Sequence, residues 1–235
     1  MLADLKETVW KANLELAKSG LIILTFGNVS GIDRRKGIVA IKPSGVAYDA
    51  MKADDIVLVD LEGNVVEGWL NPSSDTPTHV EIYKAFPQVG GVAHAHSPYA
   101  TMFAQARREI PCFGTTHADA FHGPIPVTRL LVESEVAASY EWNTGKVIVE
   151  RFAGLDPLTL PAVLVAGHGP FAWGPTPAAA VETALILELT AQMAFGSLAL
   201  DPRLPPLDAC IQDKHFSRKH GPDAYYGQKK ENQND

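Results

Sequence analysis

Near the N-terminus, apolar residues recur at intervals of three and four. They are Leu2, Leu5, Val9, Ala12 and Leu16. This spacing puts them on one face of a helix, so the pattern predicts a helix over residues 2–18, which Gly20 can end. Similar patterns predict helices over residues 77–85, 98–107 and 208–220, and a long buried helix that includes residues 184–195. Thr76 is the expected cap of the helix over 77–85, and Pro77 suits its first turn.

Short runs of apolar and β-branched residues between turn residues predict strands. They cover residues 21–24, 38–42, 56–59, 64–68, 89–97, 125–128, 146–150 and 162–166. The strands over 56–59 and 64–68 flank a short turn and predict a hairpin. Because hairpin-like connections are frequent, we expect one α/β domain in which helices cover a mixed or antiparallel sheet.

The overall composition is that of an ordinary globular protein. Of 235 residues, 46% are hydrophobic and 20% are charged, which excludes a chain that is disordered throughout. The most apolar stretch, residues 178–200, contains Glu182 and Glu188, so we expect no membrane span. The net charge of −7 argues against a nucleic-acid-binding protein with a broad cationic surface.

Two features of the sequence predict a cytoplasmic protein. The first residues show no basic segment followed by an apolar core, so no signal peptide is expected. The two cysteines, Cys112 and Cys210, are too few for a disulfide framework, and we expect both to be reduced.

Three histidines form the most informative pattern. His94 and His96 lie in the predicted strand over 89–97, where residues two apart point to the same face. His168 follows an apolar run and has a glycine on each side. The pair alone could be two hydrogen-bonded structural histidines. Three imidazoles with an open fourth position are typical of catalytic zinc, so the set favours a metal site.

Several loops carry residues that could bind an anion. Ser73 and Ser74 offer hydroxyls next to a predicted helix N-terminus, although the same residues could simply cap the helix. Asp75 could be the cap, a metal ligand or a base. Two further loops offer the residues Gly27, Asn28, Lys42, Ser44 and Gly45.

The C-terminal half adds candidates for proton transfer and phosphate binding. Asp119, in a loop that also holds His117 and His122, could be an acid or base, or could lie in a solvated loop. His215 and Arg218 are three residues apart and would face the same side of the last helix. The planar guanidinium of Arg218 suits a phosphate. Tyr226 alone would be an ordinary surface aromatic.

In chain order these segments resemble the class II (zinc) aldolase family, and within it the L-ribulose-5-phosphate 4-epimerases. The matching segments are GNVSG, KPSG, SSDTPTH, HAHS, GTTHAD, YEWNTG, HGPFAWG and DKHFSRKHGPDAYYGQ. The resemblance covers residues 1–228 as one domain and leaves a polar tail at 229–235, which we expect to be frayed. It implies a largely antiparallel sheet between helix layers, in a four-fold homotetramer with active sites between subunits.

The resemblance also assigns expected roles to individual residues. One zinc ion per subunit, or another divalent ion, would be held by His94, His96, His168 and Asp75. Substrate and phosphate contacts would come from Gly27, Asn28, Lys42, Ser44, Gly45, Ser73, Ser74, His215 and Arg218. Asp119 and Tyr226 would be the catalytic acid and base.

The resemblance implies an epimerase that interconverts L-ribulose 5-phosphate and D-xylulose 5-phosphate. A carbanion at carbon 4 gains no enolate resonance, whereas cleavage of C3–C4 leaves an enediolate that zinc can stabilise. Sugar-phosphate aldolases of the family usually carry Glu at the position of Asp75, which favours the epimerase. Three alternatives remain, namely an L-xylulose-5-phosphate epimerase, an aldolase, and a non-catalytic adducin-like binding domain. Adducin-type domains lack the zinc histidines that this chain has.

Overall fold

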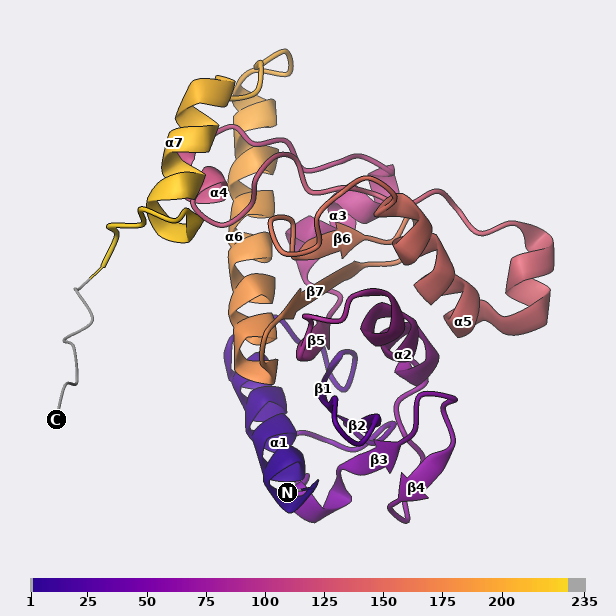
Figure 1. The fold of residues 1–235 in the computed structure, drawn as a ribbon. Helices are drawn as coiled ribbons and strands as arrows, with labels where there is room; N and C mark the ends of the chain where they lie inside the picture. The colour runs from indigo at the N-terminus through magenta and orange to yellow at the C-terminus, as the bar shows by residue number, and fades with distance from the viewer. Residues whose placement is uncertain (1, 228–235) are drawn as a thin grey trace, which may run out of the picture.

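The computed structural model describes residues 2–227, so the tail expected at 229–235 lies outside the described residues. Within this range, seven strands form one antiparallel sheet in the order β4-β3-β2-β1-β5-β7-β6 (Figure 1). The strands are β1 (Asn28–Asp33), β2 (Ile38–Ile41), β3 (Val57–Val59), β4 (Val65–Glu67), β5 (Gly91–His94), β6 (Ala162–Leu164) and β7 (Pro170–Gly174). The single α/β domain with a largely antiparallel sheet is confirmed.

Helices cover both faces of the sheet (Figure 1). They are α1 (Leu2–Lys18), α2 (Thr76–Ala85), α3 (Pro98–Ala106), α4 (Thr115–Ala118), α5 (Glu133–Arg151), α6 (Pro177–Leu200) and α7 (Ala209–His220), with a 3₁₀ turn at Ala53–Asp55. Helices α1 and α6 lie on one side of the central strands, whereas α2 and α5 lie on the other.

Two glycines let α6 approach the sheet. Gly31 and Gly91 are directly opposite each other on β1 and β5. A Cβ atom would lie 2.7 Å from the Pro177 ring at Gly31 and 2.4 Å from Pro177 N at Gly91. Since side chains alternate along a strand, the neighbouring positions of β1 face α2 instead. This alternation turns Asn28 and Ser30 toward α2.

Several predicted strands are wrong. Residues 21–24 form no strand, because the backbone turns at Leu24 (φ 57°) and the amide of Phe26 bonds to the Ile23 carbonyl. Residues 146–150, although β-branched, lie within α5, where Val147 and Ile148 are buried. Residues 125–128 make only isolated bridges. The strand expected over 89–97 is shorter, and β1, β7 and most of α5 were not predicted.

Helix α6 is longer and less buried than expected. In the described part of the chain it is the one helix whose length and composition would allow it to cross a membrane, and 28% of its most apolar window is buried. Its inner face nevertheless packs in the domain core through Ala180, Leu187 and Ala191. The Glu188 carboxylate accepts hydrogen bonds of 2.9 Å from the first two free backbone amides of α3. These contacts make α6 part of this fold.

Candidate metal centre and anion pocket

The three predicted metal-binding histidines converge on one point. One ligand nitrogen from each of His94, His96 and His168 lies within 4.8 Å of the others. The Nε2 atoms of His94 and His96 are 3.1 Å apart, close to the ~3.3 Å expected for two nitrogens on one tetrahedral zinc ion. His94 is the last residue of β5 and His96 lies just beyond the strand, and the two imidazoles still lie together as predicted.

Hydrogen bonding and burial leave these imidazoles ready to bind a cation. His94 Nδ1 donates to the Pro170 carbonyl at 2.8 Å, which leaves the lone pair on Nε2. Burial lowers the pKa of His168 to about 4, helped by its two histidine neighbours, and also lowers the pKa of His96. Neutral imidazoles offer lone pairs, so this donor set fits a divalent ion such as zinc.

The sheet register explains how His94 is held. Phe171 is directly opposite His94 on β7, and their rings stack with centroids 4.1 Å apart. Asn28 is opposite His94 on the other side, on β1. At the β6–β7 turn, Gly169 lets the backbone beside His168 lie close to Ala95, because a Cβ there would lie only 3.1 Å from the Ala95 carbonyl oxygen.

Asp75 lies beside the histidines. It occupies the N-cap of α2, but its side chain makes no capping hydrogen bond. Instead Oδ2 accepts a 2.7 Å hydrogen bond from Asn28 and lies 4.0 Å from His94 Nε2. Burial raises the pKa of Asp75, but His94, His79 and the Asn28 hydrogen bond together lower it below its usual value. An ionised carboxylate here suits a fourth ligand or a neighbour of the metal.

The anion-binding candidates share a cavity of about 430 Å³ with the histidines. Its lining includes the predicted residues Gly27, Asn28, Lys42, Ser44, Gly45, Ser73, Ser74, Asp75, His94, His96 and His168. Backbone hydrogen bonds join the two serine loops, from Ser73 N to the Lys42 carbonyl and from Ser44 N to the Asn71 carbonyl. A Cβ on Gly27 would lie 2.8 Å from the His94 carbonyl oxygen, so glycine is required there.

Lys42 is a buried cation in this cavity. It is only 2% exposed, and its ammonium group donates to the Pro43 and Val46 carbonyls at 3.2 and 2.8 Å. Among residues 2–227 no carboxylate pairs with it, and burial lowers its pKa to about 8. A buried ammonium group without a counter-charge is well suited to an anionic ligand.

Helix α5 supplies two lining residues that were not predicted, Tyr140 and Glu141. Tyr140 Oη lies 3.4 Å from His168 Nδ1. The Glu141 carbonyl accepts from Thr78 of α2 at 2.7 Å, whereas its carboxylate has no partner in the described structure. Close packing of α5 on α2 holds Tyr140 and Glu141 at the cavity. The two helices are so close that a Cβ on Gly145 of α5 would lie 2.5 Å from Glu81 Cβ of α2. The YEWNTG segment contained this signal, but no role was assigned to its residues.

The remaining candidates form a second cluster. The Asp119 carboxylate accepts from Arg218 Nη2 at 2.7 Å and from His215 Nδ1 at 3.0 Å. Partial burial raises its pKa, but Arg218, His215 and Lys219 together lower it. The ring of Tyr226, which is 61% exposed, makes cation–π contacts with Arg218 and Lys219, whose charged groups lie 5.2 and 4.4 Å from its centroid. The structure thus brings Asp119, His215, Arg218 and Tyr226 together, but not in the lining of the histidine cavity.

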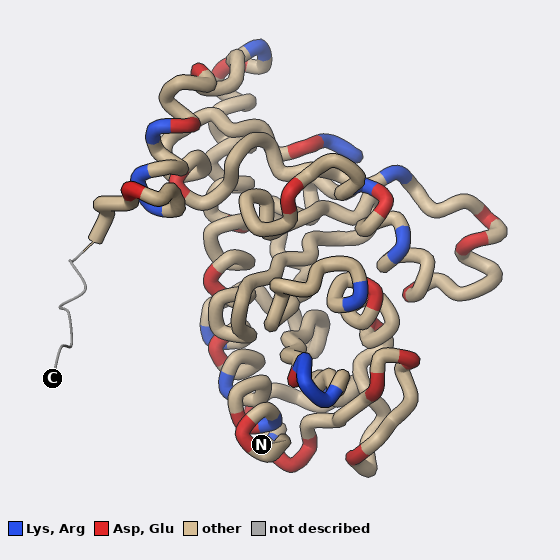
Figure 2. Tube along the Cα trace, viewed as in Figure 1, with Lys and Arg blue, Asp and Glu red and all other residues tan. Residues whose placement is uncertain are grey.

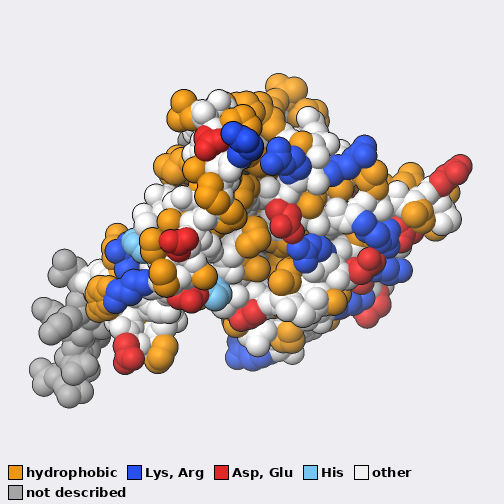
Figure 3. Space-filling model, turned by 90° about the horizontal axis from the view of Figure 1, so that it is seen from above, with side chains coloured by type: hydrophobic (Ala, Val, Ile, Leu, Met, Phe, Trp, Pro, Cys, Tyr) orange, Lys and Arg blue, Asp and Glu red, His pale blue; other side chains and the backbone are white. Residues whose placement is uncertain are grey.

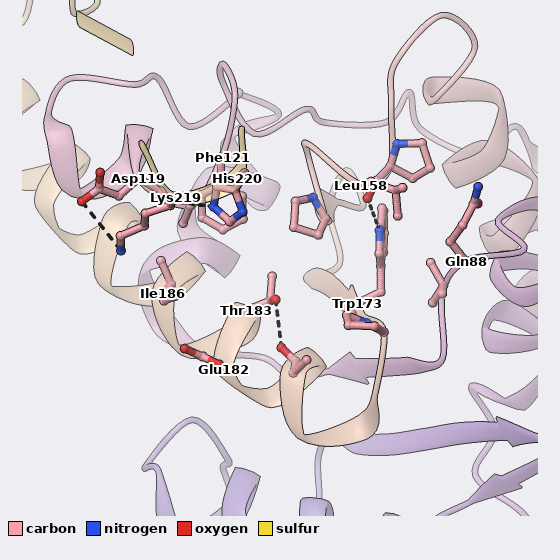
Figure 4. Close-up of a pocket in the computed structure, with 17 residues that line it drawn as sticks. Gln88, Asp119, Phe121, Leu158, Trp173, Glu182, Thr183, Ile186, Lys219 and His220 are labelled. Carbon is pink, nitrogen blue, oxygen red and sulfur yellow. Dashed lines mark hydrogen bonds and ion pairs between the residues drawn. The ribbon is translucent and has the colours of Figure 1, made fainter. Parts of the chain in front are cut away.

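Asp119 lines a different cavity of about 620 Å³ between α6, α7 and the loop over 157–161. Figure 4 shows Asp119 and Lys219 at one end of this cavity and Trp173 with Gln88 at the other. The walls between them are largely apolar and include Phe121, Leu158 and Ile186. Within one chain, therefore, the metal-site histidines and the Asp119 cluster belong to separate surfaces.

Comparison with known protein families identifies the domain. The model of the class II aldolase and adducin N-terminal domain matches residues 7–195. The chain belongs to the class II aldolase and adducin family. The family expected from the sequence motifs is thereby confirmed.

Similar solved structures share the class II aldolase fold. An L-fuculose 1-phosphate aldolase is 27% identical, with a TM-score of 0.77, and the match covers 92% of this chain and 95% of that one. The L-fuculose 1-phosphate aldolase from Glaciozyma antarctica PI12 is 22% identical, with a TM-score of 0.74 and coverage of 92% and 81%. A sugar-phosphate aldolase from Thermotoga maritima is 21% identical, with a TM-score of 0.64 and coverage of 87% and 98%.

Proposed function

We propose that this class II aldolase family member is a cytoplasmic, zinc-dependent epimerase that interconverts L-ribulose 5-phosphate and D-xylulose 5-phosphate. One observation carries the proposal. Three converging imidazoles and the buried, uncompensated Lys42 line the same cavity. A phosphorylated ketose has the matching ends, a carbonyl that a metal can polarise and a phosphate that needs a cation.

The metal would be held by His94, His96 and His168, with Asp75 beside them. When bound, a divalent ion supplies Lewis-acid stabilisation of the negative charge that develops on the ketone fragment. The protein's own residues fix the other fragment. Lys42 and the hydroxyls of the two serine loops would retain the phosphate while the C3–C4 bond is broken.

The reaction requires proton transfer at the oxygen on carbon 4. Removing that proton as C3–C4 breaks leaves an aldehyde, and the electron pair remains on carbon 3 of the ketone fragment. Rotation of the aldehyde and re-formation of the bond on its other face inverts carbon 4, and the oxygen then regains a proton. Asp119 and Tyr226 are the proposed acid and base on the two faces, and His215 and Arg218 complete the substrate site.

A second copy of the chain would bring these groups to the metal. Asp119 and Tyr226 do not line the histidine cavity of their own chain, which supports a site shared between subunits. Helix α6 presents exposed Leu189, Met193 and Leu200 (45, 48 and 90%), and many apolar side chains are exposed on the face of the molecule seen in Figure 3. A four-fold homotetramer is the proposed assembly. Acidic and basic residues are interspersed along the chain (Figure 2), so no nucleic-acid partner is proposed.

A sugar-phosphate aldolase is the second candidate, favoured by the similarity to structures named as aldolases. Asp75 favours the epimerase, because its Oδ2 is held by Asn28 beside His94 rather than presented as a free base. The experiment is incubation of zinc-loaded protein with L-ribulose 5-phosphate or L-xylulose 5-phosphate. D-xylulose 5-phosphate formed from the ribulose substrate supports the proposal. Accumulating glycolaldehyde phosphate and dihydroxyacetone supports an aldolase, turnover of L-xylulose 5-phosphate alone supports the other epimerase, and no turnover supports an adducin-like binding domain.

A further inference from the structure

A row of polar side chains, all buried except the half-buried Asp75, joins β1 to α2 next to the metal-site histidines. Asp75, His79 and Tyr83 are four residues apart and share one face of α2, about 6 Å from one to the next. Asn28 and Ser30 are two residues apart on β1, with a similar spacing of about 6.7 Å. We call these five residues the polar row.

Hydrogen bonds connect the two elements at each step. Asn28 Nδ2 donates to Asp75 Oδ2 at 2.7 Å. One step further, Ser30 Oγ lies 2.7 Å from His79 Nδ1 and 2.8 Å from Tyr83 Oη. Ser30, His79 and Tyr83 are all 0% exposed. The hydrogen bonds of Ser30 to His79 and Tyr83, which solvent cannot reach, therefore tie α2 to the strand that carries Asn28.

The row also reaches the ligand His94 through an aromatic contact. His79 meets Phe171 edge to face, with centroids 5.8 Å apart, and Phe171 stacks on His94 at 4.1 Å. The backbone amide of His79 bonds to the Asp75 carbonyl at 3.1 Å. His79 thus contacts both the helical turn that begins at Asp75 and the Phe171 ring that stacks on His94.

If packing were its only role, the imidazole of His79 would be energetically unfavourable at this position. Its Nε2 is buried and has no hydrogen-bond partner within residues 2–227. An apolar ring of similar size would avoid that unsatisfied group. The hydrogen bond to Ser30, however, needs the nitrogen, which points to a role that packing alone does not supply.

From this geometry we infer that Ser30 and His79 are positioning residues that hold Asp75 against the three-histidine group and so set the affinity of that group for a divalent ion. The inference rests on the metal centre of the proposed function, but on neither the substrate nor the reaction. Groups that orient metal ligands typically contribute 10–100-fold to metal affinity.

The test is the zinc dissociation constant of the full-length protein, measured by competition with a chromophoric chelator. Ser30→Ala and His79→Phe should each weaken zinc binding by at least about tenfold. His79→Asn, whose amide can still reach Ser30, should bind zinc more tightly than His79→Phe. Val80→Ala is the matched control, because it removes buried side-chain volume from the next position of α2 without touching the polar row.

The outcomes separate the possible failures. If Ser30→Ala and His79→Phe lower the unfolding temperature as Val80→Ala does but bind zinc as tightly as the wild type, the row is only structural and the inference is wrong. If His79→Phe does not fold, Ser30→Ala, which removes a single oxygen, decides in the same way. If the wild-type protein itself binds no zinc, the metal centre of the proposed function fails instead.

Discussion

Asn28 and His94 face each other across β1 and β5, and the Asn28 amide holds the Asp75 carboxylate 4.0 Å from the imidazole nitrogen of His94. This pairing places an acidic group beside three imidazoles, and burial lowers the pKa of two of them, His96 and His168. The same cavity contains a lysine without a counter-charge. Each of these features leads to a measurable expectation.

Replacing His96 with Asn should remove one of three converging ligands. We expect zinc affinity to fall by more than the ~10–100-fold typical of groups outside the ligand set, and activity to fall with it. Zinc content after dialysis, measured by atomic emission, checks this. His122→Asn, at a surface histidine paired with Asp213, should retain zinc. Full zinc content in the His96 variant would contradict the metal role.

Replacing Lys42 with Met should weaken substrate binding. A charge-assisted hydrogen bond contributes ~1.5–3 kcal/mol, so KM for the sugar phosphate should rise by about 10–100-fold while zinc content stays unchanged. Lys36→Met, at an exposed lysine of the β1–β2 turn, is the control and should leave KM unchanged. An unaltered KM in the Lys42 variant would mean that the phosphate binds elsewhere.

The same lysine predicts a pH dependence. Burial lowers the pKa of Lys42 to about 8 in the free protein. Its cationic form, which attracts the phosphate, is therefore lost as the pH rises through 8, and KM should increase above that pH. In Lys42→Arg the guanidinium stays charged, so this rise in KM should disappear. A wild-type KM that is flat from pH 7 to 9.5 would exclude Lys42 as the controlling group.

Replacing Tyr226 with Phe should lower turnover by roughly 10²–10⁴, the contribution typical of general acid–base catalysis, with zinc binding unchanged. The adjacent Tyr225, which is similarly exposed at 63%, provides the matched control Tyr225→Phe. Mixed oligomers of Tyr226→Phe and Asp119→Asn should recover activity only if a site with both groups intact can form. This requires the two residues to come from different subunits.

If both residues come from the same subunit, every site in the mixed oligomer lacks one of the two groups, either Asp119 or Tyr226, and no site is intact. Subunit exchange should be verified by differential tagging. Recovered activity in the mixture places Asp119 and Tyr226 on different chains. A mixture that stays as inactive as its parents assigns both residues to one chain. In that case a mixture of Asp119→Asn with the metal-site variant His96→Asn should recover activity, because the intact Asp119 of one chain can meet the intact histidines of the other.

The packing of α6 on the sheet gives a prediction for stability. In Gly91→Ala the new methyl group would meet Pro177 at 2.4 Å, and overpacking of this kind costs ~1–3 kcal/mol. The midpoint of urea unfolding should fall accordingly. Gly114→Ala, where nothing lies within 4 Å of the added Cβ, should differ little from the wild type. Equal midpoints for the two variants would contradict the close approach.

Local spacing in the sequence was sufficient to predict part of the site. His94 and His96, which are two residues apart, converge as expected, although β5 ends at His94 and His96 lies just beyond it. The helical spacing at the N-terminus likewise predicts α1. In both cases, the predicted feature depends only on residues a few positions apart in the sequence.

Features that depend on distant partners were harder to predict. Strand β1 contains Asn28 and Gly31, which have low strand propensity, and it forms a strand because β2 and β5 pair with it on both sides. Without β1, the polar row between Ser30 and His79 could not be expected. Conversely, Val147 and Ile148 favour a strand locally but are buried in a helix that packs on α2.

The most direct measurement of the central claim uses metal-free protein that is titrated with zinc while L-ribulose 5-phosphate turnover is followed. We expect no turnover without metal, and D-xylulose 5-phosphate formation that rises to a plateau at one zinc ion per chain. Full turnover in metal-free protein, or zinc binding at one equivalent with no turnover of any sugar phosphate, would contradict it.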